Sequence, residues 1–134
     1  MSELADNVRA YLEDLHLAVI ATSNRDGTVH QTALWYELRD GTIVMNTVTG
    51  SKKVRNLRRD PRASVVVVET NPARHVAVEG MVTFDEDNVM EDLVSLATRY
   101  AGPEAGPGLA ANISKIPHIT LRLSIDRVRT FGKI

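Results

Sequence analysis

The sequence predicts a small, mainly antiparallel β-barrel with helices packed around it. Six or seven short apolar segments are separated by turn signals, and their spacing suits consecutive antiparallel hairpins. Helical periodicity is confined to two longer segments and one short one. Closure into a barrel is a common way for such strands to avoid exposed edges. The 134 residues suffice for one modest core, so we expect a single domain covering residues 1–134.

Composition excludes several classes of function. The formal net charge is −1, so no overall field attracts the protein to nucleic acid or to a membrane. The chain has no cysteine, which excludes disulfides, thiol nucleophiles and cysteine metal sites. The four histidines include no pair spaced three or four residues apart, so we expect no metal site. No apolar run approaches a membrane span and the N-terminus lacks a basic leader, so we expect a cytoplasmic protein.

The N-terminal half begins with a predicted helix over residues 3–15, for which Ser2 is a possible cap. Its apolar face consists of Leu4, Val8, Tyr11, Leu12 and Leu15. Apolar segments at 17–22, 28–38 and 42–48 predict the first three strands. Because Asp26-Gly27 and Asp40-Gly41 are turn signals between them, we expect successive hairpins.

The C-terminal half is predicted to contain three more strands, at 63–69, 75–84 and 118–125, with 126–134 as a candidate extension of the last. Gly80 lies inside one strand and indicates a bulge, a barrel corner or a ligand close to the backbone. Residues 85–100 have helical periodicity, whereas the glycines and prolines of 102–116 predict a loop. In the last strand, alternation places His118, Thr120, Arg122 and Ser124 on the outward face.

A basic segment at the end of the third strand is the most informative stretch. Gly50 breaks the strand, Ser51 can cap a short helix, and Pro61 stops that helix. Lys52 and Lys53 stand in the first helical turn, where the helix dipole disfavours cations. A bound phosphate would remove this conflict, because dipole and free N–H groups both favour an anion.

The helical phase of this segment selects one lysine. Val54 and Leu57 define the buried side, which places Lys53 and Arg58 on the flanks between core and water. We therefore favour Lys53 as the anion ligand over a surface helix with solvated charges. Nucleic acid is a weaker alternative: residues 52–62 carry six basic side chains, but aromatic residues make up only 4% of the chain.

The second strand could hold a planar ring. Alternation places Gln31, Ala33 and Trp35 on one face, although a single Trp is more often part of a core or a subunit interface. A cofactor lying along this strand could place its phosphate at Ser51 to Lys53. The neighbouring strands offer no acid–base pair, so such a ligand would carry its own chemistry.

Several segments together resemble one family. They are Ala18 to Thr22 before the Asp26-Gly27 turn, Leu34-Trp35-Tyr36, Gly50 to Arg62, and Val78-Glu79-Gly80. With these motifs the whole chain resembles the flavin and deazaflavin oxidoreductases related to pyridoxamine 5'-phosphate oxidase. The similarity is strongest to the small members that use coenzyme F420.

This resemblance implies a six- to seven-stranded antiparallel split β-barrel with peripheral helices. It further implies a homodimer with a cofactor in each of two grooves between the subunits. The implied activity is transfer of hydride from reduced F420 to a small conjugated acceptor. Flavin-using relatives have an arginine where Lys52 stands, so FMN is the second choice. A carrier of flavin, deazaflavin or a haem-like molecule is the alternative from another class.

The resemblance also implies a set of cofactor-binding residues, but no catalytic residue or proton donor. Ser51, Lys52 and Lys53 would hold the phosphate, and the helical phase described above adds Arg58 to the candidate cofactor-binding residues. The ring system and ribityl chain would contact Gln31, Thr32, Ala33, Leu34, Asn46, Thr47 and Val48. Arg74 and His75 would come from the partner subunit.

Overall fold

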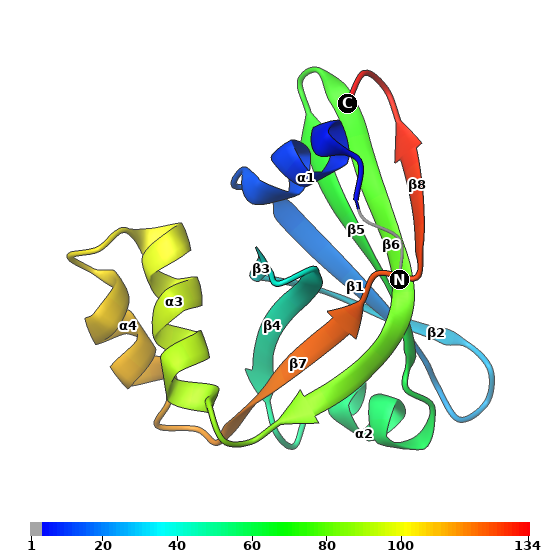
Figure 1. The fold of residues 1–134 in the computed structure, drawn as a ribbon. Coiled ribbons are helices and arrows are strands. Elements are labelled where there is room, and N and C mark those ends of the chain that lie inside the picture. Colours follow the sequence, from blue (N-terminus) through cyan, green and yellow to red (C-terminus); the bar gives the residue numbers. More distant parts are fainter. Residues whose placement is uncertain (1–3) are drawn as a thin grey trace.

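A computed structural model describes residues 4–134, so the proposed cap Ser2 lies outside the described residues. Along these residues the chain forms four helices and eight strands (Figure 1). The helices are α1 (Asp6–Glu13), α2 (Lys52–Arg59), α3 (Val89–Ala101) and α4 (Gly106–Ile113). The strands are β1 (Leu17–Ser23), β2 (Val29–Leu34), β3 (Tyr36–Arg39), β4 (Thr42–Val48), β5 (Arg62–Thr70), β6 (Ala73–Asp85), β7 (His118–Ser124) and β8 (Arg127–Phe131).

All strand pairs are antiparallel, in the order β2-β1-β5-β6-β7-β4-β3, with β8 also paired to β6. The long strand β6 joins two halves, because it pairs with β5 as far as Met81 and with β7 from Val82 onward. Within residues 4–134, no ladder joins β2 to β3. The split β-barrel is therefore confirmed, whereas the closed barrel expected from strand spacing is wrong.

The predicted second strand is two strands, divided at Trp35. The reason lies in the next residue, Tyr36, which is fully buried and donates a 2.8 Å hydrogen bond from its hydroxyl to Leu12 O. Trp35 turns to the helical side and stacks on Tyr100 with ring centroids 5.3 Å apart. Because Trp35 and Tyr36 are held on opposite sides of the chain, the strand is interrupted here and passes from one half of the barrel to the other.

Gly80 marks the corner at which β6 changes partners. A Cβ atom at this position would lie 1.7 Å from the backbone oxygen of Ser124. Only glycine permits this approach, which confirms the barrel corner among the three options left by the sequence.

The loop predicted over 102–116 is wrong, because residues 106–113 form α4. Its glycine and proline serve helix packing here. A Cβ on Gly106 would lie 2.5 Å from the Thr98 Cα, so Gly106 lets α4 approach α3, and Pro107 stands in the first turn where its missing N–H costs nothing. Ala110 is buried against Leu93 and Ala97 of α3.

Three element boundaries also differ from expectation. Helix α1 ends at Glu13, which leaves Leu15 exposed rather than on the buried face. Helix α3 begins at Val89, because Asp85 instead accepts backbone hydrogen bonds from Asp87 and Asn88 in the preceding turn. Residues 127–131 do not extend β7 but return to pair with β6 as β8.

The core has two parts. The barrel interior is filled mainly by aliphatic side chains of the strands, with α1 and α2 supplying Leu12, Val54 and Leu57. The second part lies between α3, α4 and Trp35. These two helices stand together beside β4 and β7 (Figure 1). None of the described helices is both long and apolar enough to span a membrane.

Candidate functional site

A cavity of about 330 Å³ lies where the ends of β2 and β4, the start of α2, and the α3–α4 pair come together. Its lining consists of Ala33, Leu34, Trp35, Asn46, Thr47, Val48, Lys53, Leu93, Leu96, Ile113 and His118. Six of these are residues for which the sequence predicted cofactor contacts, from three segments of the chain. We call this space the β4–α2 pocket.

Lys53 supplies the positive charge of the β4–α2 pocket. Its Nζ donates a 2.9 Å hydrogen bond to Thr47 Oγ1. Within the described chain, no carboxylate forms an ion pair with it. Partial burial lowers the pKa of the Lys53 ammonium, because desolvation disfavours its charged form. Such a partly desolvated, unpaired cation is suited to binding an anion.

Three predicted cofactor residues have a buried polar atom without a hydrogen-bond partner in the described residues: Asn46 Oδ1, which belongs to the lining, and Thr32 Oγ1 and Ser51 Oγ, which do not. Ser51 occupies the N-cap position of α2 as predicted, but its hydroxyl does not make the predicted capping bond. A buried polar atom without a partner costs about 1–3 kcal/mol. A phosphorylated ligand with a polar heterocycle would supply these partners, so the residues present fit a flavin or deazaflavin.

Other predicted residues lie outside the lining. Lys52 faces a separate cavity on the other flank of α2, together with Arg25, Arg55 and Arg59. The Arg58 guanidinium packs 4.5 Å from the ring centroid of Phe84. It also forms a 3.8 Å ion pair with Glu86.

Gln31, Arg74 and His75 are also absent from the lining. Gln31 is exposed on β2. Arg74 pairs with Glu69 at 2.8 Å, and the His75 ring stacks 5.4 Å from Phe131. This β5–β6 hairpin is at the opposite end of the sheet from α2 (Figure 1). Arg74 and His75 can therefore reach a β4–α2 pocket only on a second chain.

Several lining residues were missed by the sequence analysis. Leu93, Leu96 and Ile113 reach the pocket because α3 and α4 pack together over it. His118 lies opposite Val48 in the β4–β7 ladder. Its Nδ1 is 2.6 Å from Ile116 O, so this nitrogen carries the hydrogen and Nε2 is left for other partners. Periodicity placed His118 on the outward face of its strand, without showing that helices cover that face.

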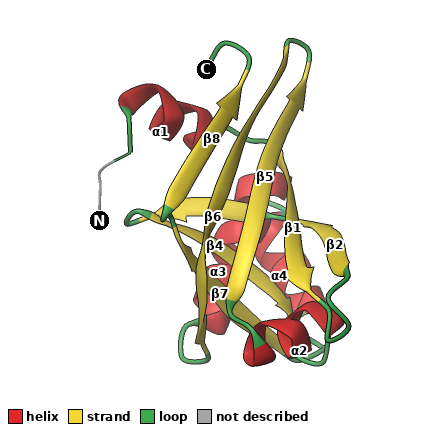
Figure 2. Cartoon of the chain, turned by 90° about the vertical axis from the view of Figure 1, so that its right-hand side faces the viewer, coloured by secondary structure: helices red, strands yellow, loops and turns green. Residues whose placement is uncertain are grey.

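The face of β1, β5 and β6 that points away from the barrel interior carries two mainly apolar rows, beside a more polar row that contains Ser64, Glu79 and Arg127. Cross-strand pairing places Ala33, Val19, Val66 and Ala77 in one row, which ends at Arg129 of β8. A second row contains Leu17, Val68, His75 and Phe131, of which Leu17 is 58% and Phe131 56% exposed. A cavity of about 620 Å³ adjoins these rows. In Figure 2 these strands stand in front, and α3 and α4 lie behind them. We call this surface the outer sheet face.

Comparison with known proteins places the chain in a family. The sequence profile described as pyridoxamine 5'-phosphate oxidase matches residues 4–132, which include all eight strands. The chain belongs to this pyridoxamine 5'-phosphate oxidase family. The F420H(2)-dependent biliverdin reductase of Mycobacterium tuberculosis (strain CDC 1551 / Oshkosh) is 30% identical over 110 residues, 79% of each chain.

Solved structures agree with this membership of the pyridoxamine 5'-phosphate oxidase family. A conserved hypothetical protein from Mycobacterium tuberculosis superimposes with a TM-score of 0.81 at 29% identity, covering 97% of this chain and 86% of that one. A protein described as F420 reductase gives a TM-score of 0.79 at 21% identity, covering 94% of this chain and 98% of that one. At that identity the second similarity shows the shared fold alone.

Proposed function

We propose that this protein is an F420-dependent reductase that transfers hydride from the reduced deazaflavin to a small conjugated organic acceptor. The observation that carries the proposal is the β4–α2 pocket, in which Lys53 lies together with five other predicted cofactor residues. The relative that is 30% identical over 79% of both chains is named as an F420H(2)-dependent biliverdin reductase. Biliverdin is a conjugated tetrapyrrole, so acceptors of this kind, enones and quinones are the compounds to test.

Different residues would bind the phosphate and the ring of the cofactor. Lys53 and the Ser51 hydroxyl would hold the phosphate at the first turn of α2. The side chains of Trp35, Leu93 and Leu96 form apolar walls that would exclude water from the ring. A bound deazaflavin supplies the hydride, while the protein orients it and its acceptor.

The functional unit we propose is a homodimer formed through the outer sheet face. Its rows of small and aliphatic side chains, with exposed Leu17 and Phe131, form the kind of surface that a partner subunit covers. His75 belongs to one of these rows. In the proposed dimer, the His75 side chain of each subunit would therefore lie against the other subunit. Arg74, held by Glu69 at the same end, would accompany it.

FMN is the second candidate cofactor, because the unpartnered atoms of Thr32, Asn46 and Ser51 suit a flavin as well as a deazaflavin. The alternative function that is not enzymatic is a carrier that binds such a molecule, or a haem-like one, without catalysing a reaction. It would use the same apolar walls without an acceptor site.

The cofactor and the activity can be tested in sequence. Fluorescence titration with F420 and with FMN compares the two affinities, and we expect tighter binding of F420. The oxidation of reduced F420 is then followed anaerobically with enones, quinones and biliverdin. Tight binding without oxidation by any acceptor would support the carrier, and preferential FMN binding would reject the deazaflavin.

A further inference from the structure

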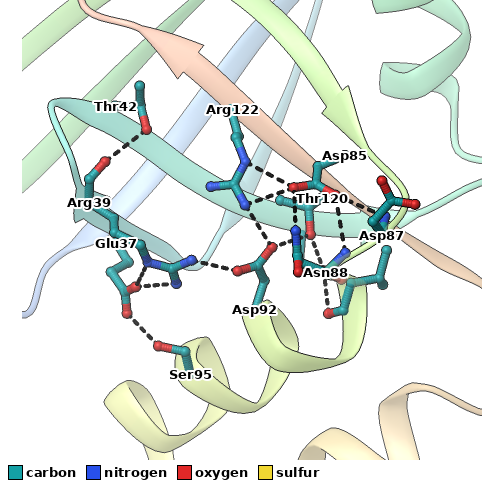
Figure 3. A network of polar contacts seen from close by, with 12 residues as sticks. Glu37, Arg39, Thr42, Asp85, Asp87, Asn88, Asp92, Ser95, Thr120 and Arg122 are labelled. Atoms are coloured by element: carbon teal, nitrogen blue, oxygen red, sulfur yellow. Dashed lines mark hydrogen bonds and ion pairs between the residues drawn. The ribbon is translucent and has the colours of Figure 1, made fainter.

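A buried network beside the pocket is centred on Asp92 of α3, whose side chain lies between Arg39 and Arg122 in Figure 3. Asp92 is only 2% exposed. Its carboxylate accepts hydrogen bonds from Arg39 Nη1 at 2.5 Å, Arg122 Nη2 at 3.2 Å and Thr120 Oγ1 at 2.9 Å. Arginine N–H groups can only donate, so both oxygens of this carboxylate act as acceptors.

The direction of the Thr120 hydrogen bond follows from this. A hydroxyl has one hydrogen, and Thr120 donates it to Asp92, so the Thr120 oxygen can only accept from other groups. Asn46 lies on the other side of Thr120, with its Nδ2 3.3 Å from Thr120 Oγ1 and 3.4 Å from Val89 O. Both neighbours are acceptors, so the Asn46 amide must present its NH₂ group to them.

The other end of the amide is therefore the carbonyl. Asn46 Oδ1 is buried without a hydrogen-bond partner in the described residues, and Asn46 lines the β4–α2 pocket. We infer that Asp92, acting through Thr120, orients Asn46 as a hydrogen-bond acceptor for an N–H group on the edge of the bound ring. This inference rests on the proposed function, because it specifies how the cofactor ring is recognised.

The ligand class follows from the acceptor. Flavins and deazaflavins carry an imide N–H in their pyrimidinedione ring, and it can donate to Oδ1. Because Oδ1 is buried before the ligand enters, the contact needs a small rotation of the Asn46 side chain. The two Nδ2 hydrogen bonds are long, at 3.3 and 3.4 Å, so they permit such a rotation. Asp92 and Thr120 are positioning residues in this arrangement.

Binding of F420 and its N3-methyl derivative tests the recognised group. We compare wild type with Thr120→Val, which removes the hydroxyl at nearly constant volume, and with Thr120→Ser, which keeps it. Wild type should bind the N–H form roughly tenfold to a hundredfold more tightly, since the methyl compound leaves Oδ1 unpaired. Thr120→Val should reduce this ratio several-fold, because only the long contact with Val89 O then favours the same amide direction, and Thr120→Ser should retain it.

A second measurement does not depend on a ligand. Hydrogen exchange of the Asn46 side-chain amide, assigned by its loss in Asn46→Leu, should be slow in wild type and Thr120→Ser. It should be faster in Thr120→Val, although circular dichroism shows a folded protein. This readout separates loss of amide orientation from general destabilisation.

The outcomes separate the two proposals. Equal binding of the N–H and N-methyl forms by wild type would overturn the role of Asn46, while leaving the F420 assignment intact. An unchanged ratio in Thr120→Val would overturn the part played by Thr120 and Asp92. Failure of wild type to bind F420 at all would overturn the proposed function and, with it, this inference.

Discussion

The Lys53 ammonium and the Thr47 hydroxyl are joined by a 2.9 Å hydrogen bond across the turn between β4 and α2. Thr47 is buried near the end of its strand, and Lys53 stands in the first turn of its helix. The bond holds the ammonium over the pocket instead of letting it extend into water. A flexible lysine loses side-chain entropy on binding, and here part of that loss has occurred before the ligand arrives.

Replacing Lys53 should weaken cofactor binding far more than replacing its neighbour. We expect Lys53→Ala to reduce F420 affinity by about 1.5–3 kcal/mol, the range for a hydrogen bond to a charged group. Lys52→Ala is the matched control, because Lys52 has the same charge but faces the other flank of α2. A fluorescence titration measures both. Equal effects of the two variants would show that the phosphate is not held in the β4–α2 pocket.

The pH dependence of binding should report the lowered pKa of Lys53. Burial disfavours its ammonium, so the proton is lost below the ordinary lysine value of about 10.4. Affinity for F420 should therefore fall as pH rises through this lowered pKa, and in Lys53→Met this decrease should be absent. Titrations over the alkaline range check this. An identical pH profile in the variant would contradict it.

The Lys53 ammonium should also make stability depend on pH, but here the free energy of unfolding should rise with pH, whereas the affinity for F420 falls. Between the folded and unfolded pKa values the unfolded chain binds more protons at this position, so the free energy of unfolding rises with pH there. Below both values the penalty for the buried charge is fully present. Urea denaturation without ligand should show that Lys53→Met lacks this rise.

Glycines at two positions should respond to alanine in opposite directions. At Gly80 the new Cβ would collide with the Ser124 backbone oxygen, so Gly80→Ala should cost about 1–3 kcal/mol of stability or more. At Gly108, inside α4, no atom lies within 4 Å of the added Cβ. Gly108→Ala should therefore stabilise the protein by about 0.5–1 kcal/mol. Thermal and urea denaturation of both variants check these signs.

The outer sheet face should determine the oligomeric state. Val66 lies in the row formed with Val19 and Ala77, so a charge there would be buried in the proposed dimer. We expect Val66→Glu to yield monomers and to weaken F420 binding, and Val66→Ile to remain dimeric. Light scattering after size-exclusion chromatography measures the mass. A Val66→Glu protein that stays dimeric would place the interface elsewhere.

Much of the sheet could be predicted from local patterns. Turn signals such as Asp26-Gly27, the apolar runs of β1 and β4, and the alternation of apolar residues in β7 act over a few residues, so a single sequence displays them. The basic turn after β4 was found in the same way. The glycines of α4 were misread, because Gly106 serves a contact with Thr98 that is distant in the chain.

The sequence by itself determined where β-structure forms, where a cation-rich helix begins after Gly50, and that Lys53 flanks the buried side of that helix. Tertiary structure alone decided that Lys52 and Lys53 face different cavities, that α3 covers Thr120, and that Asn46 is left with an unpaired acceptor. The physical reason is range: dihedral preferences and periodicity are local, whereas burial and hydrogen-bond direction depend on residues brought together from distant segments.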